Sequence, residues 1–83
     1  MNNKPTNQAI SVKLNPKKLL YSKWTATVPQ NREKHFMVVK LIQADDADAP
    51  IETIEIEAIH SKRRQTLAWR ELTNKELWRQ GWL

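Results

Sequence analysis

Hydrophobic and polar residues alternate in short stretches of the chain, and this period of two is typical of half-buried β-strands. In residues 23–28, 53–59 and 64–69 nearly every second side chain is apolar, which predicts strands with one buried and one wet face. In residues 35–43 apolar side chains occur at both odd and even positions, and so on both faces of a strand. We therefore expect a central strand that is covered on both faces. Residues 29–31, Pro-Gln-Asn, are predicted to end the first strand. The short connections then predict an antiparallel meander, as a curled sheet or a small open barrel.

The last part of the chain carries the signature of a short helix. Thr73 is followed three residues later by Glu76, a spacing that lets each side chain bond the backbone amide of the other residue as a capping box. Gly81, the only glycine, falls where a helix end favours a left-handed residue. These signals predict an α-helix over about residues 74–80. The predicted fold class is therefore α+β, with a four-stranded antiparallel sheet over residues 23–69 and a short C-terminal α-helix.

Four tryptophans stand out in a chain with one Phe and one Tyr. Because Trp has a large apolar surface, it needs either a core or a ligand to cover it. Trp24, Trp69 and Trp78 are expected mainly in the core, with Trp78 fixing the predicted helix to the sheet. Trp82 is as consistent with the core as with an exposed binding face.

The length and composition predict one small domain. Residues 1–14 are polar and are expected to form a flexible tail, which leaves residues 15–83 as a single tryptophan-rich domain. The chain has no cysteine, which fits a reducing compartment. No secretory signal peptide and no membrane-spanning run is recognisable in the sequence. We therefore expect a soluble cytoplasmic protein without membrane contact.

The net charge of +5 is unevenly distributed along the chain. Residues 1–40 hold eight Lys or Arg and one acid (+7), residues 41–60 hold six acids and no Lys or Arg (−6), and residues 61–83 hold six bases and two acids (+4). This segregation predicts a basic surface with an acidic patch set apart from it. The alternative is that the charges only solvate a small domain.

Three segments together carry a family resemblance. They are NPKKLLYSKWTATVPQNREKHFMVV (15–39), SKR (61–63) and the closing WREL…LWRQGW (69–82). The chain resembles the small bacterial tryptophan-rich proteins grouped as a domain of unknown function, DUF2389, over about residues 15–83. That family is uncharacterised, so the resemblance implies a bacterial source and supplies neither a reaction nor a ligand.

Catalytic and metal-binding patterns are weak. With a single glycine the chain offers neither a nucleophile elbow nor a phosphate-cradling loop. His35 and His60 are too far apart in sequence for a zinc motif. Asp45, Asp46 and Asp48 lack the glycine and the distal glutamate of an EF-hand. We expect a protein that is not an enzyme and that uses neither a metal nor a cofactor.

Basic residues precede or flank the aromatic ones, a combination that suits single-stranded nucleic acid, because cations follow its backbone and aromatic rings stack on its bases. The sequence therefore predicts a binding module for a polyanion such as single-stranded nucleic acid. The alternative is a protein-interaction or adaptor module that binds an acidic partner or self-associates through an open sheet edge, as a monomer or weak homodimer. The candidate anion-binding residues are Lys17, Lys18, Lys23, Arg32, Lys34, Lys62, Arg63 and Arg64, and the candidate stacking or core aromatics are Trp24, Trp69, Trp78 and Trp82.

Overall fold

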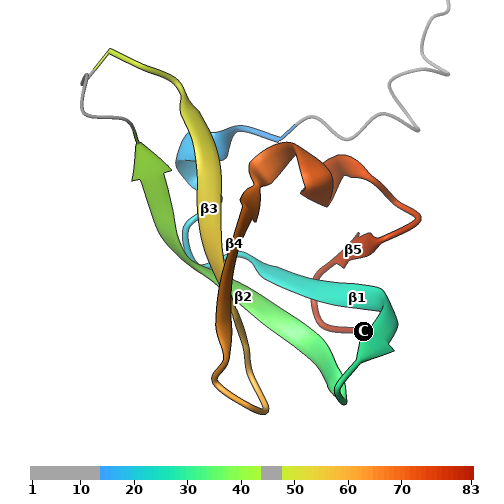
Figure 1. Cartoon of the computed structure of the whole chain (residues 1–83). Coiled ribbons are helices and arrows are strands. Elements are labelled where there is room, and N and C mark those ends of the chain that lie inside the picture. Colours follow the sequence, from blue (N-terminus) through green and yellow to red (C-terminus); the bar gives the residue numbers. More distant parts are fainter. Residues whose placement is uncertain (1–13, 44–47) are drawn as a thin grey trace, which may run out of the picture.

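The computed structural model describes residues 14–43 and 48–83. Their secondary structure is five strands and two short 3-10 helices (Figure 1), namely η1 (Pro16–Lys18), β1 (Lys23–Gln30), β2 (Glu33–Gln43), β3 (Ile51–Ala58), β4 (Arg64–Ala68), η2 (Trp69–Thr73) and β5 (Trp78–Gln80). The predicted tail over residues 1–14 lies outside the described residues except for Leu14, which packs against the core. Asp45 and Asp46 also lie outside them.

The predicted meander is present. The sheet is antiparallel with the strand order β4-β3-β2-β1-β5, so the strand that is apolar at both parities, β2, is indeed the central one. Residues 29–31 do end the first strand, although β1 runs to Gln30 and so extends two residues beyond the predicted strand over residues 23–28. Pro29 is accommodated because it lies where β1 is irregular against β2, between Thr25 and Gln30, so the missing N–H removes no regular ladder bond.

The α+β class and the C-terminal helix are wrong. The described residues contain no α-helix, and the stretch predicted to be one holds β5, which pairs with β1. The Thr73 hydroxyl donates to the Arg70 carbonyl at 2.6 Å instead of capping a helix. A two-turn helix is marginal in water, whereas the open edge of β1 offers a ladder of backbone bonds. Gly81 has a φ of 86°, but it ends a strand rather than a helix.

The core contains Trp24 as its largest fully buried side chain. Trp24 is 1% exposed, and its indole N–H donates to the Ser22 hydroxyl at 2.8 Å, so the predicted core position is confirmed. Trp78 on β5 is half-buried and meets the Phe36 ring edge-on at 5.1 Å between centroids. Trp69 is also half-buried against the core. Leu72 of η2 is 1% exposed, so η2 closes the core as it carries the chain from β4 to β5.

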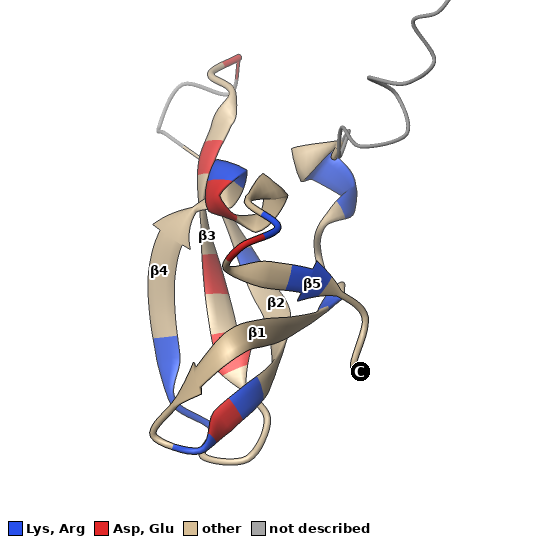
Figure 2. Ribbon diagram, turned by 90° about the vertical axis from the view of Figure 1, so that its right-hand side faces the viewer, with Lys and Arg blue, Asp and Glu red and all other residues tan. Residues whose placement is uncertain are grey.

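The predicted separation of acidic and basic surfaces is wrong. The acidic residues of β3 lie beside the basic start of β4 (Figure 2), because β3 and β4 are antiparallel neighbours. Arg64 bonds both Glu55 and Glu57, and Arg70 pairs with Glu52. Segments of opposite charge along the chain therefore neutralise each other across the sheet.

No helix in residues 14–43 and 48–83 is long and apolar enough to cross a membrane.

The packing of Trp78 gives a stability prediction. Trp78→Ala removes the ring that lies edge-on against Phe36 and should lower the free energy of unfolding by about 3 kcal/mol. Leu77→Ala is the matched control, because Leu77 is the neighbouring residue and is 46% exposed; it should stay within about 0.5 kcal/mol of the parent. Urea unfolding measures the stability of the two variants. Equal unfolding midpoints would show that the contact of Trp78 with Phe36 does not stabilise the fold.

Candidate anion-binding site

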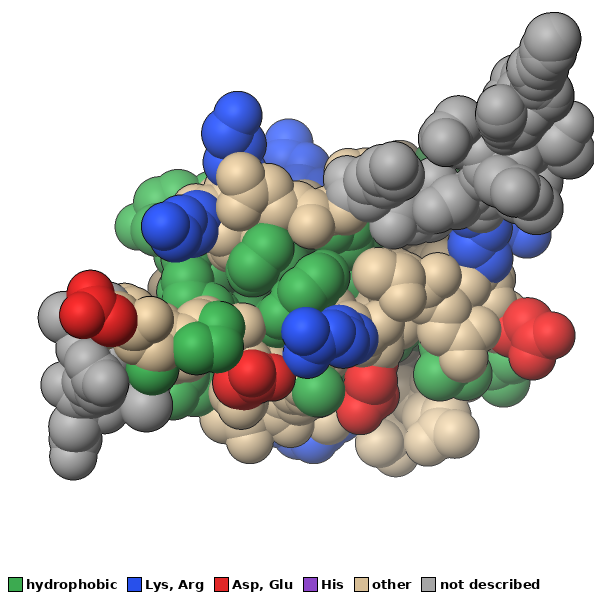
Figure 3. All heavy atoms as spheres, turned by 90° about the horizontal axis from the view of Figure 1, so that it is seen from above, with side chains coloured by type: hydrophobic (Ala, Val, Ile, Leu, Met, Phe, Trp, Pro, Cys, Tyr) green, Lys and Arg blue, Asp and Glu red, His purple; other side chains and the backbone are tan. Residues whose placement is uncertain are grey.

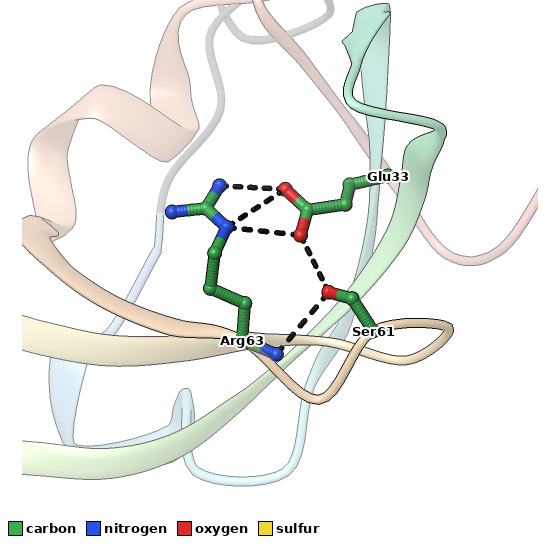
Figure 4. Close-up of polar contacts among 3 residues, drawn as sticks. All are labelled: Glu33, Ser61 and Arg63. Carbon is green, nitrogen blue, oxygen red and sulfur yellow. Dashed lines mark hydrogen bonds and ion pairs between the residues drawn. The ribbon is translucent and has the colours of Figure 1, made fainter.

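A buried carboxylate fixes one end of the sheet. Glu33, at the start of β2, is 4% exposed. Its carboxylate accepts a hydrogen bond from the Arg63 guanidinium at 2.9 Å and another from the Ser61 hydroxyl (Figure 4). The bonds from Arg63 and Ser61 lower the pKa of Glu33 to about 2. The cluster therefore clamps the turn between β3 and β4 against the beginning of β2.

The β1–β2 turn places two cations beside this clamp. Gln30 and Glu33 are partners, so Asn31 and Arg32 form a two-residue hairpin turn, and both have left-handed φ values of 55° and 61°. Arg32 and Lys34 flank Glu33 in sequence. Glu33 is buried, whereas its neighbours Arg32 and Lys34 are exposed.

An open hollow lies at this end of the sheet. Its volume is about 410 Å³. We call it the basic hollow, and it is lined by Arg32, Lys34, His35, Ile59 and His60. The β2–β3 ladder builds it, because the Ile59 amide donates to the His35 carbonyl at 2.9 Å. No acidic side chain lines the hollow, so an anionic ligand would meet the cations Arg32 and Lys34 there without a carboxylate beside them.

Trp82 extends this face beyond the basic hollow. Its indole N–H donates to the Phe36 carbonyl at 2.9 Å, which holds the ring over the start of β2. The Lys23 ammonium lies 4.7 Å from the Trp82 ring centroid, and the His35 ring centroid lies 5.9 Å from it. Trp82 is 39% exposed. Since His35 both lines the basic hollow and contacts Trp82, the cations and the aromatic ring form one continuous strip.

The remaining predicted cations are not all brought together. Lys17 and Lys18 lie on η1, at the other end of the sheet from the two hairpin turns. Viewed from above, that end exposes hydrophobic side chains in its middle (Figure 3). Arg63 and Arg64 are engaged with Glu33 and with the β3 carboxylates. These partners raise the pKa of both arginines.

Lys62 is exposed on the β3–β4 turn, between Ser61 and Arg63. Apart from Lys17 and Lys18, the predicted cations without an ion pair among the described residues are Lys23, Arg32, Lys34 and Lys62. Arg32 and Lys34 line the basic hollow, and Lys23 lies over Trp82.

The sequence does not single out the two histidines as candidate anion-binding residues. His35 and His60 are weak zinc or catalytic candidates, because they are far apart in sequence for a zinc motif and no nucleophile elbow accompanies them. The β2–β3 pairing nevertheless brings both into the wall of one hollow. A signal was available, because residues 35–43 and 53–59 are predicted to form neighbouring antiparallel strands. His35 begins the first of these strands and His60 follows the second, so pairing brings them together. In the described part of the chain no three His, Asp or Glu side chains gather as metal ligands.

Comparison with protein families gives one match. The family model described as "Tryptophan-rich protein (DUF2389)" matches residues 22–83, which include all five strands and Trp82. Neither the curated proteins nor the solved structures contain a match.

The Glu33 clamp predicts a specific loss of stability in acid. Because folding lowers the pKa of Glu33 from 4.5 to about 2, its contribution is complete above pH 4.5 and is lost as the pH falls toward 2. Glu33→Gln should therefore melt below the parent at pH 7, and the difference should shrink between pH 4.5 and pH 2. Melting curves across this range test it, with Glu76→Gln as the control, since Glu76 is exposed. If the melting temperatures of the parent and Glu33→Gln differ by the same amount from pH 4.5 to pH 2, ionisation of Glu33 does not contribute to stability as expected.

Proposed function

The chain belongs to the DUF2389 family of tryptophan-rich proteins, and we propose that it is a non-catalytic module that binds single-stranded nucleic acid through the strip from the basic hollow to Trp82. The observation that carries the proposal is the junction at His35, which lines the acid-free hollow and contacts the exposed Trp82 ring. A cationic groove beside an aromatic ring is the combination by which single strands are bound without strong sequence preference.

The charges of the strip support a phosphodiester backbone as the ligand. Lys23, Arg32 and Lys34 have no ion pair among the described residues. Arg32 and Lys34 can therefore neutralise a phosphate without first breaking an ion pair, while Lys23 would offer its charge from above the Trp82 ring. By contrast, a phosphate that binds Arg63 or Arg64 would compete with the carboxylates of Glu33 and Glu57, which already accept hydrogen bonds from these arginines. The ligand-binding cations are accordingly a subset of the basic residues of the chain.

The exposed aromatic ring favours a single strand over a duplex. Trp82 is the most exposed of the tryptophans, whereas Trp24 is enclosed in the core and Trp78 is packed on Phe36. Unpaired bases offer faces that stack on such a ring, while the bases of a duplex are stacked on one another. A single stacking ring predicts weak sequence preference, because every base has a face to offer.

A second candidate function is protein binding at the other side of the sheet, and one observation favours it. β4 is an edge strand, and between it and β1 lies a hollow of about 430 Å³. Val28, which lines this hollow, is 70% exposed. An open edge beside exposed apolar side chains suits an added strand from a partner or from a second copy of the chain. A dimer on sizing that persists in 1 M salt would favour this function.

The nucleic-acid proposal predicts where binding is lost. Lys23→Ala/Lys34→Ala removes two free cations of the strip and should weaken binding of a labelled single-stranded 12-mer about tenfold in low salt. The slope of log K against log salt should flatten by about 1.4. The matched control is Lys17→Ala/Lys18→Ala, which removes the same charge from η1 at the other end of the sheet. Fluorescence anisotropy at several salt concentrations measures both variants.

Equal losses in the two double variants would mean that only the net charge matters, and the strip would not be the site. An absence of binding by the parent at micromolar concentrations would refute the function itself.

The stacking role of Trp82 gives a separate prediction. Saturating oligonucleotide should quench the part of the tryptophan fluorescence that acrylamide also quenches, because both reach the 39% exposed Trp82 ring. In Trp82→Leu this quenching should disappear, and affinity should fall by about 1–3 kcal/mol. Oligonucleotide quenching that survives in Trp82→Leu would place the bases elsewhere.

A further inference from the structure

Two cations at the basic end of the sheet have an unfavourable backbone conformation. Among the described residues, four that are not glycine have a positive φ: Tyr21 (68°), Asn31 (55°), Arg32 (61°) and Lys62 (65°). Asn tolerates this left-handed region, but long side chains such as Arg and Lys rarely adopt it, because the Cβ atom comes too close to the backbone. Arg32 and Lys62 both lie in the turns that the Glu33 clamp joins.

Glycine or asparagine would suit these positions better. Arg32 is the second residue of a two-residue hairpin turn, a place that commonly holds glycine because both turn residues need a positive φ. Lys62 lies in the β3–β4 turn, where its amide donates to the Ala58 carbonyl at 2.8 Å. Neither side chain has an ion pair among the described residues. The strain is therefore not offset by a bond that these cations make within the described fold.

The clamp keeps the two cations at the same end of the molecule. Arg32 immediately precedes Glu33, and Lys62 lies between Ser61 and Arg63, which both bond the Glu33 carboxylate. Arg32 also lines the basic hollow, as does His60, two residues before Lys62. Turn tips project their side chains away from the sheet, so these cations can reach a ligand that lies across both turns.

We propose that Arg32 and Lys62 contact phosphates in addition to the lysines of the strip, and that the ligand is a strand with two or more phosphates that bridges the β1–β2 and β3–β4 turns. The inference rests on the proposed function and adds which turn residues contact the phosphates of the ligand. Strained conformations persist where the surrounding structure holds them, and they gather at functional sites. Here the strain places a cation at each turn where a glycine would give a more relaxed backbone.

The test separates stability from binding. Arg32→Gly and Lys62→Gly should each keep or raise the melting temperature, by up to about 5 °C, because they relieve the left-handed strain. Each should also weaken binding of the single-stranded 12-mer at least threefold and flatten the salt slope by about 0.7. Asn31→Gly is the matched control, as it changes the same turn without removing a cation; its affinity should equal that of the parent.

Two further measurements narrow the interpretation. Arg32→Lys keeps both the charge and the strain, so its salt slope should equal that of the parent. A dinucleotide with a single phosphate should lose less affinity in Lys62→Gly than the 12-mer does, because one phosphate can still bind at Arg32 alone.

The outcomes distinguish this inference from the function on which it rests. If the parent binds the 12-mer and both glycine variants bind it as Asn31→Gly does, the two cations are not phosphate contacts, and the function stands without them. If the glycine variants melt well below the parent, the turns are not strained and the inference is overturned. If the parent binds no oligonucleotide, both the function and the inference fail.

Discussion

The ion pair between Glu33 and Arg63 is the interaction on which the candidate site depends. A carboxylate that is 4% exposed needs partners for its charge, and Arg63 and Ser61 provide them from the opposite hairpin turn. Glu33 sits between two free cations in sequence, and Arg63 follows a third. One inward ion pair therefore holds three outward cations at one end of the sheet. Without it the β3–β4 turn would lose its side-chain anchor to β2 and keep the backbone bond from the Ile59 amide to the His35 carbonyl.

The same arrangement explains why total charge is a poor guide to the binding surface. Antiparallel pairing sets the acidic residues of β3 beside Arg64, so those charges stabilise the sheet rather than attract a ligand. Of the predicted cations, those without an ion pair among the described residues lie in turns, in η1 or near the start of a strand. Two of them, Arg32 and Lys62, have left-handed backbones. Under the proposed function, stability and binding would make opposite demands on the turn residues of this small domain.

The end of the chain illustrates competition between local and tertiary signals. Thr73 and Glu76 are spaced for a helix cap, but a helix of two turns has few internal bonds. As a strand, β5 gains a ladder with β1 and places Trp78 against Phe36. It also carries Trp82 onto the outer face, where the ring contacts Lys23 and His35. The aromatic part of the site therefore exists because the local helix signal was overridden.

The sequence by itself determined the meander and its central strand, because apolar residues at both parities in residues 35–43 require cover on both faces. It also determined that Trp24 is enclosed, since alternation placed it on the inner face of β1. The tertiary structure alone decided that β5 is a strand, that His35 and His60 share one hollow, and which cations are free. Those features depend on contacts between residues far apart in sequence, and their energies appear only when the strands pair.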